Sequence, residues 1–217
     1  MRAPVRFYRL MRVGIVSLAL AGCVSFSGEE RPTHTFLLSL DSSAGKAPSP
    51  EGKPGAWTLV VNVPVAQPGF ETPRMAYRQR LYEVSYYAAH QWADPPSQML
   101  RPLLVQALER AGYWRAVVPM PTSVRGDHRV EIDQVELIQD FLQKPSQVRV
   151  MLRMQIIKLP DYLVLGTRLF DVAEEAASDD AYGGAVAANL AVGRLVKEVA
   201  VWVGGCVSGG QGRGCSR

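Results

Sequence analysis

The sequence predicts an α+β domain in which a mixed, largely antiparallel sheet has two helices packed on one face. Two observations carry this prediction. Strand patterns stand before and after one helical pattern, and a second helical pattern follows the last strand, so the order is strands, helix, strands, helix. The run 128–172 also alternates apolar and polar residues, which is typical of antiparallel strands with one solvated face.

We expect the first strands in the N-terminal part of the domain. Residues 33–40 form one apolar run, and residues 57–65 form a second that is apolar almost throughout, as in a strand buried on both faces. The segment 41–55 between them is rich in Pro, Gly and Ser, which predicts a flexible loop. Short strands around tight turns are expected at 75–77 and 81–87.

The first helix is expected to follow the stretch SYYAAHQWADPP at 85–96. Asp94 is a good N-cap, and Pro95 suits the first helical position because its missing N–H is not needed there. Apolar residues then recur at helical spacing until Gly112, which we expect to end the helix in a left-handed conformation. Pro102 predicts either a kink or a later start of the regular helix.

This strand-to-helix corner has two interpretations. Tyr86, Tyr87 and Trp92 carry large amphipathic rings, and Pro95 and Pro96 follow them at the turn. The rings either pack the corner, with their polar tips bonded to the protein, or stack on a ligand. We favour packing, which makes the motif structural.

The later strands are expected at 113–119, 128–142, 147–159 and 162–172. The alternation slips between Ile132 and Val135, which predicts a β-bulge. A long final helix then presents one apolar stripe to the sheet: Ala185, Ala188, Val192, Leu195, Val199 and Trp202.

Residues 204–217 form a Gly-rich tail that we expect to be frayed. Cys206 and Cys215 lie nine positions apart in this tail. In an oxidising compartment these two cysteines either close a small disulfide loop or remain free, and nothing else in the tail fixes their geometry.

The N-terminus has the pattern of an export signal. Four arginines and no acidic residue lead into the apolar run 13–21, which is roughly half of the ~20 residues that a membrane-spanning helix needs. Leu20, Ala21 and Gly22 then precede Cys23. Small residues before the cleavage point suit the signal peptidase, and the cysteine thiol is able to carry a lipid.

This pattern resembles a bacterial lipobox, with residues 1–22 as the signal peptide and residues 23–33 as a lipidated tether. The resemblance implies diacylglycerol on Cys23, cleavage before it, and acylation of the new amine. Two or more acyl chains give stable membrane attachment. Val24 stands where an inner-membrane retention signal usually has aspartate, which favours the outer membrane by analogy with lipoprotein sorting. An ordinary signal peptide with a chance cysteine is the alternative.

The basic excess of the chain belongs to the signal segment. The chain has 24 Lys and Arg against 20 Asp and Glu, and the four extra positive charges all lie in residues 1–22. The remaining chain is balanced at 20 of each. We therefore expect no nucleic-acid partner, because such a partner needs a clustered basic excess.

We expect no enzymatic function, no cofactor and no metal site. His34, His90 and His128 have no second His or Cys at metal-ligand spacing. No G-x-S-x-G motif occurs, and the glycines at 209–214 lack the Lys-Ser/Thr of a phosphate loop. The acidic residues at 174–180 suit a solvated loop before the last helix better than a weak calcium site.

Two longer motifs link these elements. The pattern L-x-V-x-x-P-x-A-x-P-G-F-x-T-x-R-M-x-Y runs from Leu59 to Tyr77, and Y-Y-A-x-x-x-W-A-x-P-P-x-x-M-L runs from Tyr86 to Leu100. Together with the lipobox and the closing amphipathic helix, they resemble the ABC-type transport auxiliary lipoproteins. These are the PqiC-like proteins found beside MCE-domain transporters. The resemblance covers the predicted domain, residues 34–203, and the Gly/Cys tail departs from the pattern.

The resemblance implies a periplasm-facing domain that is anchored by lipid in the outer membrane and forms homo-oligomers in some members. Such a protein docks on an MCE-domain transporter and assists the movement of lipids or other hydrophobic compounds between membranes, without catalysis. On this view a loop contacts the partner, and the aromatic corner holds the loop in place. The residues that shape this loop are Pro68, Gly69, Phe70, Thr72, Arg74 and Tyr77.

Two other functions remain open from the sequence. One is a lipid-carrying module in which the aromatic residues line an apolar groove. The other is an envelope assembly or secretion lipoprotein, which differs in its partner and not in its chemistry.

Overall fold

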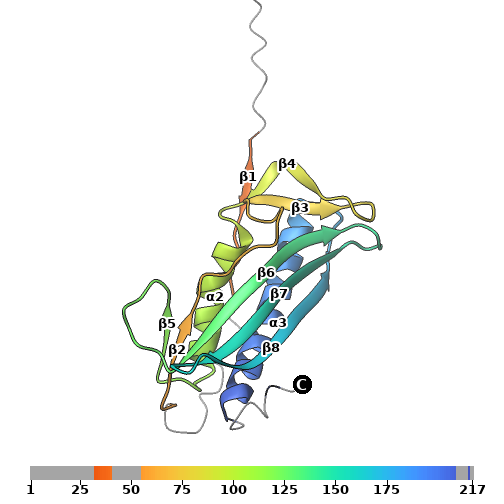
Figure 1. Cartoon of the computed structure of the whole chain (residues 1–217). Coiled ribbons are helices and arrows are strands. Elements are labelled where there is room, and N and C mark those ends of the chain that lie inside the picture. The colour runs from red at the N-terminus through yellow and green to blue at the C-terminus, as the bar shows by residue number, and fades with distance from the viewer. Residues whose placement is uncertain (1–31, 41–54, 209–214, 216–217) are drawn as a thin grey trace, which may run out of the picture. The chain divides into compact units, whose positions relative to one another are not determined.

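The computed structural model describes residues 32–40, 55–208 and 215 (Figure 1). The chain divides into two units, Met1–Pro32 and Thr33–Arg217, and the second is the folded domain. The predicted signal peptide with Leu20, Ala21, Gly22 and Cys23, most of the tether, and nearly all of the predicted loop at 41–55 lie outside the described residues.

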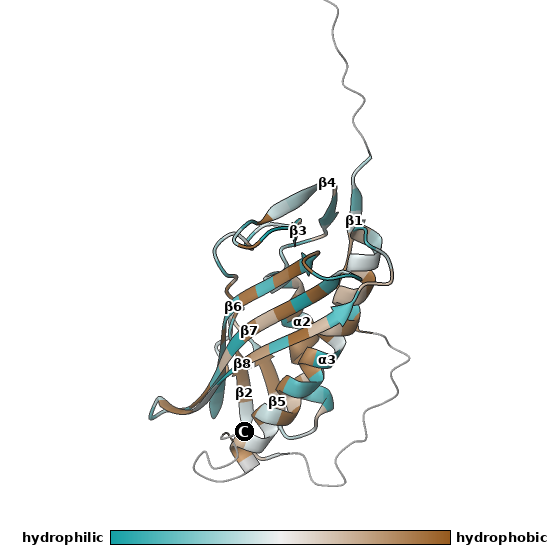
Figure 2. Ribbon diagram, turned by 90° about the vertical axis from the view of Figure 1, so that its right-hand side faces the viewer, coloured by the Kyte–Doolittle hydropathy of each residue, from teal (hydrophilic) through white to brown (hydrophobic). Residues whose placement is uncertain are grey.

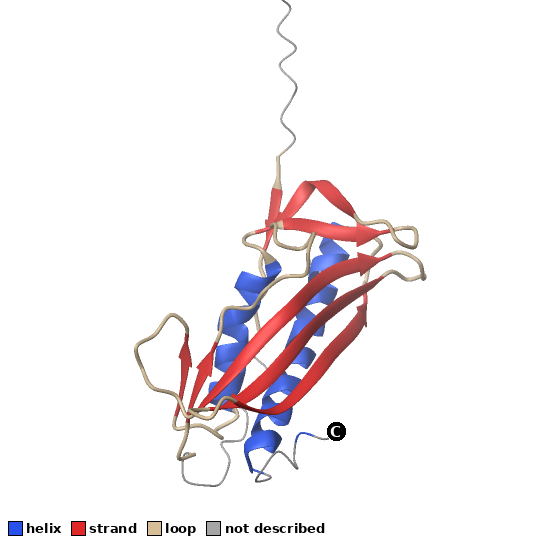
Figure 3. Cartoon of the chain, in the orientation of Figure 1, coloured by secondary structure: helices blue, strands red, loops and turns tan. Residues whose placement is uncertain are grey.

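The predicted α+β fold is confirmed: within the described ranges, a mixed sheet has two helices on one face (Figure 3). The elements in chain order are β1 (His34–Phe36), β2 (Thr58–Val61), β3 (Arg74–Arg78), β4 (Ser85–Trp92), α2 (Pro96–Arg110), β5 (Ala116–Pro119), β6 (His128–Asp140), β7 (Gln147–Lys158), β8 (Leu163–Glu175) and α3 (Ala181–Ser208).

Strand β6 organises the sheet. Along one edge its first half pairs with β2 and its last residues pair with β3, both in parallel. Along the other edge it pairs antiparallel with β7, which in turn pairs antiparallel with β8, so the predicted meander is confirmed. Strands β4 and β1 extend the sheet beyond β3, and β5 extends it beyond β2.

The predicted bulge is also confirmed. The register of β6 against β7 shifts between Asp133 and Glu136, and Gln134 has a φ of +54°. An extra residue at this point bends the strand and increases its twist. The bulge therefore divides β6 into the half that pairs with β2 and the half that pairs with β3.

Strand β4 differs from its predicted position. We expected a strand at 81–87, whereas β4 begins at Ser85 and continues to Trp92. Residues 79–84 are exposed and form the turn from β3, with Tyr82 at a φ of +66°. The last residues of β4 stay in the sheet because β1 pairs with them in parallel, His34 opposite His90.

Helix α2 begins one residue later than predicted. Its N-cap is Pro95, in an extended conformation with ψ of 135°, and Asp94 does not cap it. The reason is Pro96, since a residue that precedes proline is disfavoured from the helical conformation. Pro102 lies inside the helix, and Gly112 takes the predicted left-handed conformation with φ of +70°.

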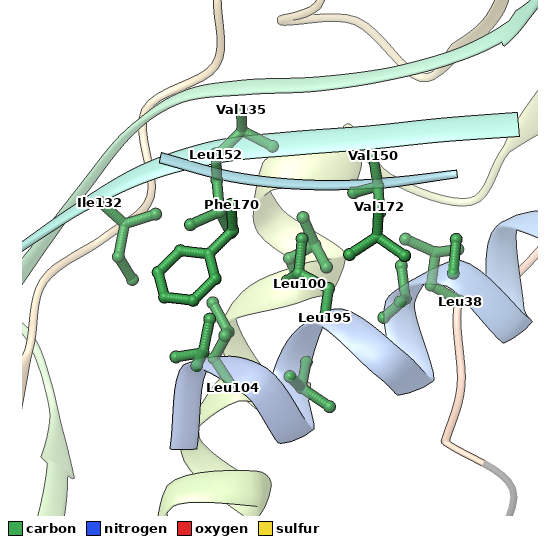
Figure 4. Close-up of a cluster of buried hydrophobic side chains, with 14 of the residues drawn as sticks. Leu38, Leu100, Leu104, Ile132, Val135, Val150, Leu152, Phe170, Val172 and Leu195 are labelled. Atoms are coloured by element: carbon green, nitrogen blue, oxygen red, sulfur yellow. The ribbon is translucent and has the colours of Figure 1, made fainter. Parts of the chain in front are cut away.

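The core lies between the sheet and the two helices (Figures 2 and 4). Figure 4 shows Phe170 and Val150 of the sheet pointing toward Leu195 of α3, with Leu100 and Leu104 of α2 beside them. All six residues of the predicted α3 stripe are buried. Among the described residues, no helix has the length and apolarity needed to cross a membrane.

Helix α3 extends past the predicted end of the domain. It continues to Ser208, so residues 204–208, which we expected to be frayed, are helical. Val203 and Cys206 continue the apolar stripe and are buried, which explains the longer helix. A disulfide joins Cys206 to Cys215. Cys215 packs so closely on β8 that a Cβ added to Gly166 would lie 2.6 Å from the Cys215 Cβ.

Leu195→Ala tests the packing of α3 on the sheet. We expect it to lower the free energy of unfolding by about 2–5 kcal/mol, because it leaves a cavity in a fully buried site. The matched control is Leu190→Ala on the outer face of the same helix, where the side chain is 57% exposed. Urea denaturation measures both; equal losses would contradict the predicted helix orientation.

Candidate functional site

The candidate docking loop is residues 66–74, which follow β2 and end at the first residue of β3, and backbone hydrogen bonds tie its start to the β6 bulge. The Val65 N–H donates to Ile132 O at 2.9 Å, and the Val135 N–H donates back to Val65 O at 3.1 Å. The Gln67 N–H then donates to Val135 O at 2.9 Å. The loop therefore leaves the sheet at a fixed point.

Side chains of β3 and β4 hold the centre of the loop. The Tyr86 hydroxyl donates to Gly69 O at 2.7 Å, and the Arg74 guanidinium lies 3.8 Å from the centre of the Tyr86 ring. Gly69 has a φ of +92°, a conformation that other residues rarely adopt, and its N–H donates to Glu71 Oε2 at 2.7 Å. Glu71 is a loop residue that sequence reasoning missed.

The loop exposes some of the predicted residues and buries others. Pro68, Gly69 and Arg74 are exposed, whereas Phe70 and Thr72 are partly buried. The Thr72 hydroxyl oxygen is buried without a hydrogen-bond partner among the described residues. The exposed side of the loop therefore includes Pro68, Gly69, Glu71 and Arg74.

Tyr77 lies away from this loop. It sits near the end of β3, with its ring 4.8 Å from that of Tyr87 and 6.0 Å from that of Phe141. The structure thus brings Gly69 and Arg74, with the adjacent Pro68, to Tyr86. Tyr77 instead packs with Tyr87 and Phe141.

Tyr87 belongs to a buried polar network. Its hydroxyl donates to Gln139 Oε1 at 3.0 Å, and Gln139 Nε2 donates to Ser146 Oγ at 3.0 Å and to Asp180 O at 3.2 Å. Burial, and then the charge of Asp180, raise the pKa of Tyr87 to about 12. Gln139 lies outside the two sequence motifs, so the sequence did not predict that it links Tyr87 to Ser146 and Asp180.

The corner after β4 is closed by protein contacts. Trp92 is buried, its backbone N–H donates to Pro73 O at 2.7 Å, and the Phe36 ring packs edge-on against its indole ring at 6.4 Å. Pro96 is buried at the start of α2. Because Tyr86, Tyr87 and Trp92 each have partners within the domain, these contacts favour the structural interpretation of the motif over ligand stacking.

The histidines have aromatic surroundings. His34 stacks on His90 at 5.1 Å, and His128 lies between Trp57 and Trp114, with ring centres at 5.6 and 5.7 Å. Burial lowers the pKa of His128. Within the described ranges, no group of three or more His, Cys, Asp or Glu side chains is arranged to hold a metal ion.

The acidic residues before α3 serve the structure. Asp180 accepts the Gly183 N–H at 2.7 Å in the first turn of α3, and Asp179 accepts the Ser146 N–H at 2.8 Å. These hydrogen bonds lower the pKa of both carboxyl groups. Glu174 pairs with Arg194 on α3.

One groove of about 410 Å³ lies along the outer side of α2, next to Pro119 of β5. Four of the six α2 side chains that line it are polar or charged: Gln98, Arg101, Gln106 and Glu109. Sites for acyl chains are mostly apolar, whereas these four side chains place polar and charged groups along the groove.

Tyr86→Phe tests how the loop is held. Removing the hydroxyl leaves Gly69 O without its donor, and we expect amide exchange at Gly69 and Phe70 to become about fivefold faster, which corresponds to about 1 kcal/mol. Tyr182→Phe, on the exposed face of α3, is the control. Unchanged exchange in Tyr86→Phe would show that the loop does not depend on this hydrogen bond.

Tyr87→Phe tests the raised pKa. The unfolded chain releases the tyrosine proton near pH 10, whereas the folded protein holds it until about pH 12, so the unfolded state binds fewer protons in this range. Stability is therefore retained below about pH 10 and falls as the pH rises toward 12. Urea unfolding at neutral and alkaline pH should show a smaller fall for Tyr87→Phe than for the original chain; equal falls would argue against the shift.

Comparisons with known proteins match the domain to one family and to solved structures of the same fold. The model of the family "ABC-type transport auxiliary lipoprotein component" matches residues 36–200. A crystal structure of a Xanthomonas campestris protein of the DUF330 family superposes with a TM-score of 0.70 at 25% identity, covering 83% of this chain and 98% of that one.

A crystal structure of an uncharacterized protein has the same fold, with a TM-score of 0.58 at 12% identity, and covers 80% of this chain and 99% of that one. No curated protein matches the chain. The family match spans nearly all of the folded domain, from β1 to the last turns of α3. The chain therefore belongs to the family of ABC-type transport auxiliary lipoproteins.

Proposed function

We propose that this chain is a non-catalytic accessory of an intermembrane transport system of the MCE/ABC type, which moves lipids or other hydrophobic compounds. In this proposal, the domain faces the periplasm, is held in the outer membrane by a lipid on Cys23, and docks on the MCE-domain protein of the transporter. The family supports an auxiliary role in ABC-type transport. The partner, the membrane and the substrate class come from the resemblance described above.

The observation that carries the docking proposal is the way the 66–74 loop is held. It is fixed at its start by the β6 bulge and at its centre by Tyr86, yet Pro68, Glu71 and Arg74 remain exposed. A surface that is ordered before binding loses less conformational entropy when a partner arrives. This combination favours protein recognition by a preformed loop.

A lipid carrier is less well supported by the contacts of the aromatic residues. A carrier needs an apolar cavity open to the lipid, but Tyr87 and Trp92 pack within the domain, and four of the six α2 side chains along the groove are polar or charged. No specific observation favours the other alternative, a role in envelope assembly or secretion. Homo-oligomer formation stays a prediction, to be measured by light scattering.

Arg74→Glu tests the docking proposal. The full-length lipoprotein is affinity-purified from detergent-solubilised envelopes of its own cell, and the co-purified MCE-domain protein is quantified. Reversing an exposed charge in the loop should lower its recovery about tenfold, equivalent to about 1.4 kcal/mol. Arg125→Glu, an identical charge change before β6, is the matched control.

Arg74→Lys separates charge from loop support, because it keeps a cation for the Tyr86 ring. We expect this variant to recover the partner better than Arg74→Glu. Thermal unfolding confirms that every variant is folded. If folded Arg74→Glu retains as much partner as Arg125→Glu, the loop is not the docking surface; if the original chain retains no MCE-domain protein, the proposed partner is wrong.

A further inference from the structure

The turn between β3 and β4 is a run of exposed residues that is separate from the docking loop. Every residue from 79 to 84 is exposed. Three of them are large and apolar or aromatic: Leu81 is 64% exposed, Val84 is 44% exposed, and Tyr82 is as open to solvent as an isolated residue, at 104%. Scattered single apolar residues are ordinary on a surface, but three within four positions form a patch.

The backbone conformation at Tyr82 in this turn is unfavourable for a tyrosine. Tyr82 has a φ of +66°, a region favoured by Gly and Asn and costly for a bulky side chain. Within the described ranges, the Tyr82 ring makes no hydrogen bond and no ring contact that would compensate. A fully exposed aromatic residue held in a strained turn points to a contact outside the domain.

The neighbouring turn enlarges this patch. Strands β3 and β6 end side by side, with Arg78 paired to Asp140 and the Phe141 N–H donating to Arg78 O at 2.9 Å (Figure 1). The β6–β7 turn therefore adds Leu142, which is 40% exposed. We call the four residues Leu81, Tyr82, Val84 and Leu142 the hairpin tip.

Cations flank the hairpin tip. Arg80 is exposed and lies only loosely near Glu83, at 3.9 Å, while Lys144 is exposed in the β6–β7 turn. Tyrosine is enriched at the membrane–water interface, and Lys and Arg place their charged ends among the headgroups while their aliphatic parts lie on apolar surface. The composition of the hairpin tip is that of an interfacial membrane contact.

The tip lies at the end of the domain where the tether enters. Strand β1 pairs with β4 in parallel, His34 opposite His90, and the β3–β4 part of the tip ends just before Ser85. Along β4 this separation is at most about 17 Å, whereas the ten residues from Cys23 to Thr33 can span up to ~35 Å. A lipid on Cys23 and the hairpin tip can therefore reach the same bilayer surface.

We propose that the hairpin tip inserts into the interface of the phospholipid bilayer that holds the lipid of Cys23, as a second membrane contact. This inference rests on the lipid attachment in the proposed function. It does not depend on the identity of the transporter.

The opposite end of the sheet offers a matched control. The β7–β8 turn also carries an exposed tyrosine with positive φ, Tyr162 at +55°, followed by the exposed Leu163. This turn lies at the start of β6, where His128 pairs with Lys158, about 40 Å along the strand from the hairpin tip. Unlike Tyr82, Tyr162 has an internal partner, because the Arg129 guanidinium lies 5.6 Å from its ring.

The test uses the full-length lipoprotein with an environment-sensitive fluorophore (NBD) on a single new thiol, in Tyr82→Cys, Leu81→Cys or, as control, Tyr162→Cys. Cys206 and Cys215 are joined in a disulfide, and a lipidated Cys23 is blocked, so only the new thiol reacts. Each labelled protein is reconstituted into phosphatidylethanolamine/phosphatidylglycerol vesicles, with and without nitroxide groups on the acyl chains. Mass spectrometry records the acylation of Cys23, and vesicle flotation records membrane attachment.

We expect the emission of the label at positions 81 and 82 to shift to shorter wavelength and to be quenched by the nitroxide lipids, while the label at 162 stays in water. A floating, acylated protein whose labels at 81 and 82 remain in water overturns the membrane contact and leaves the lipid anchor intact. A wavelength shift without quenching overturns it in favour of a contact with a second copy of the chain. A chain that is not acylated and does not float overturns both the anchor and this inference.

Discussion

Strand β6 forms backbone hydrogen bonds along both of its edges, and the other strands depend on it. One edge is occupied by β7, and the other is shared in succession by the short parallel strands β2 and β3. The chain between these two strands follows β6 as well, because Asn62, Val65 and Gln67 each donate an N–H to a β6 carbonyl. The start of the docking loop is therefore fixed by the same strand that builds the sheet.

Most of the fold could be predicted because its signals are local. The alternation of β6, β7 and β8, the slip that marks the bulge, and the stripe of α3 each involve residues close in sequence. The predicted bounds were wrong where contacts with residues distant in the sequence determine the end of an element. β4 reaches Trp92 because β1 pairs with it, and α3 passes residue 203 because Cys206 is buried. The start of α2 was the exception, since the effect of Pro96 on Pro95 is local and was overlooked.

The candidate site was less predictable for the same reason. The motif identified the loop by its Pro, Gly and Arg residues, but the side chain that holds Gly69 belongs to Tyr86, which is seventeen positions away. Tyr77 belongs to the same sequence motif, yet its ring packs on Tyr87 and not on Tyr86. Tyr86 and Tyr87 are neighbours in β4, and neighbouring residues of a strand point to opposite faces of the sheet. The sequence did not predict the hairpin tip, because residues 81–87 have the pattern of a strand. In the structure, residues 79–84 form an exposed turn instead.

The docking loop ends at the first residue of β3 and the hairpin tip follows its last residue, so one short strand, about 13 Å from Arg74 to Arg78, joins them. A lipid at the end of a tether fixes the distance of a domain from the bilayer only within the reach of the tether and leaves its orientation free. A second contact at the tip would restrict rotation, and β4, whose Tyr86 bonds Gly69 of the loop, would then hold the loop at a defined height above the membrane. Docking on a large transporter would gain from this restriction, because a loop already facing its partner has a higher effective concentration for binding.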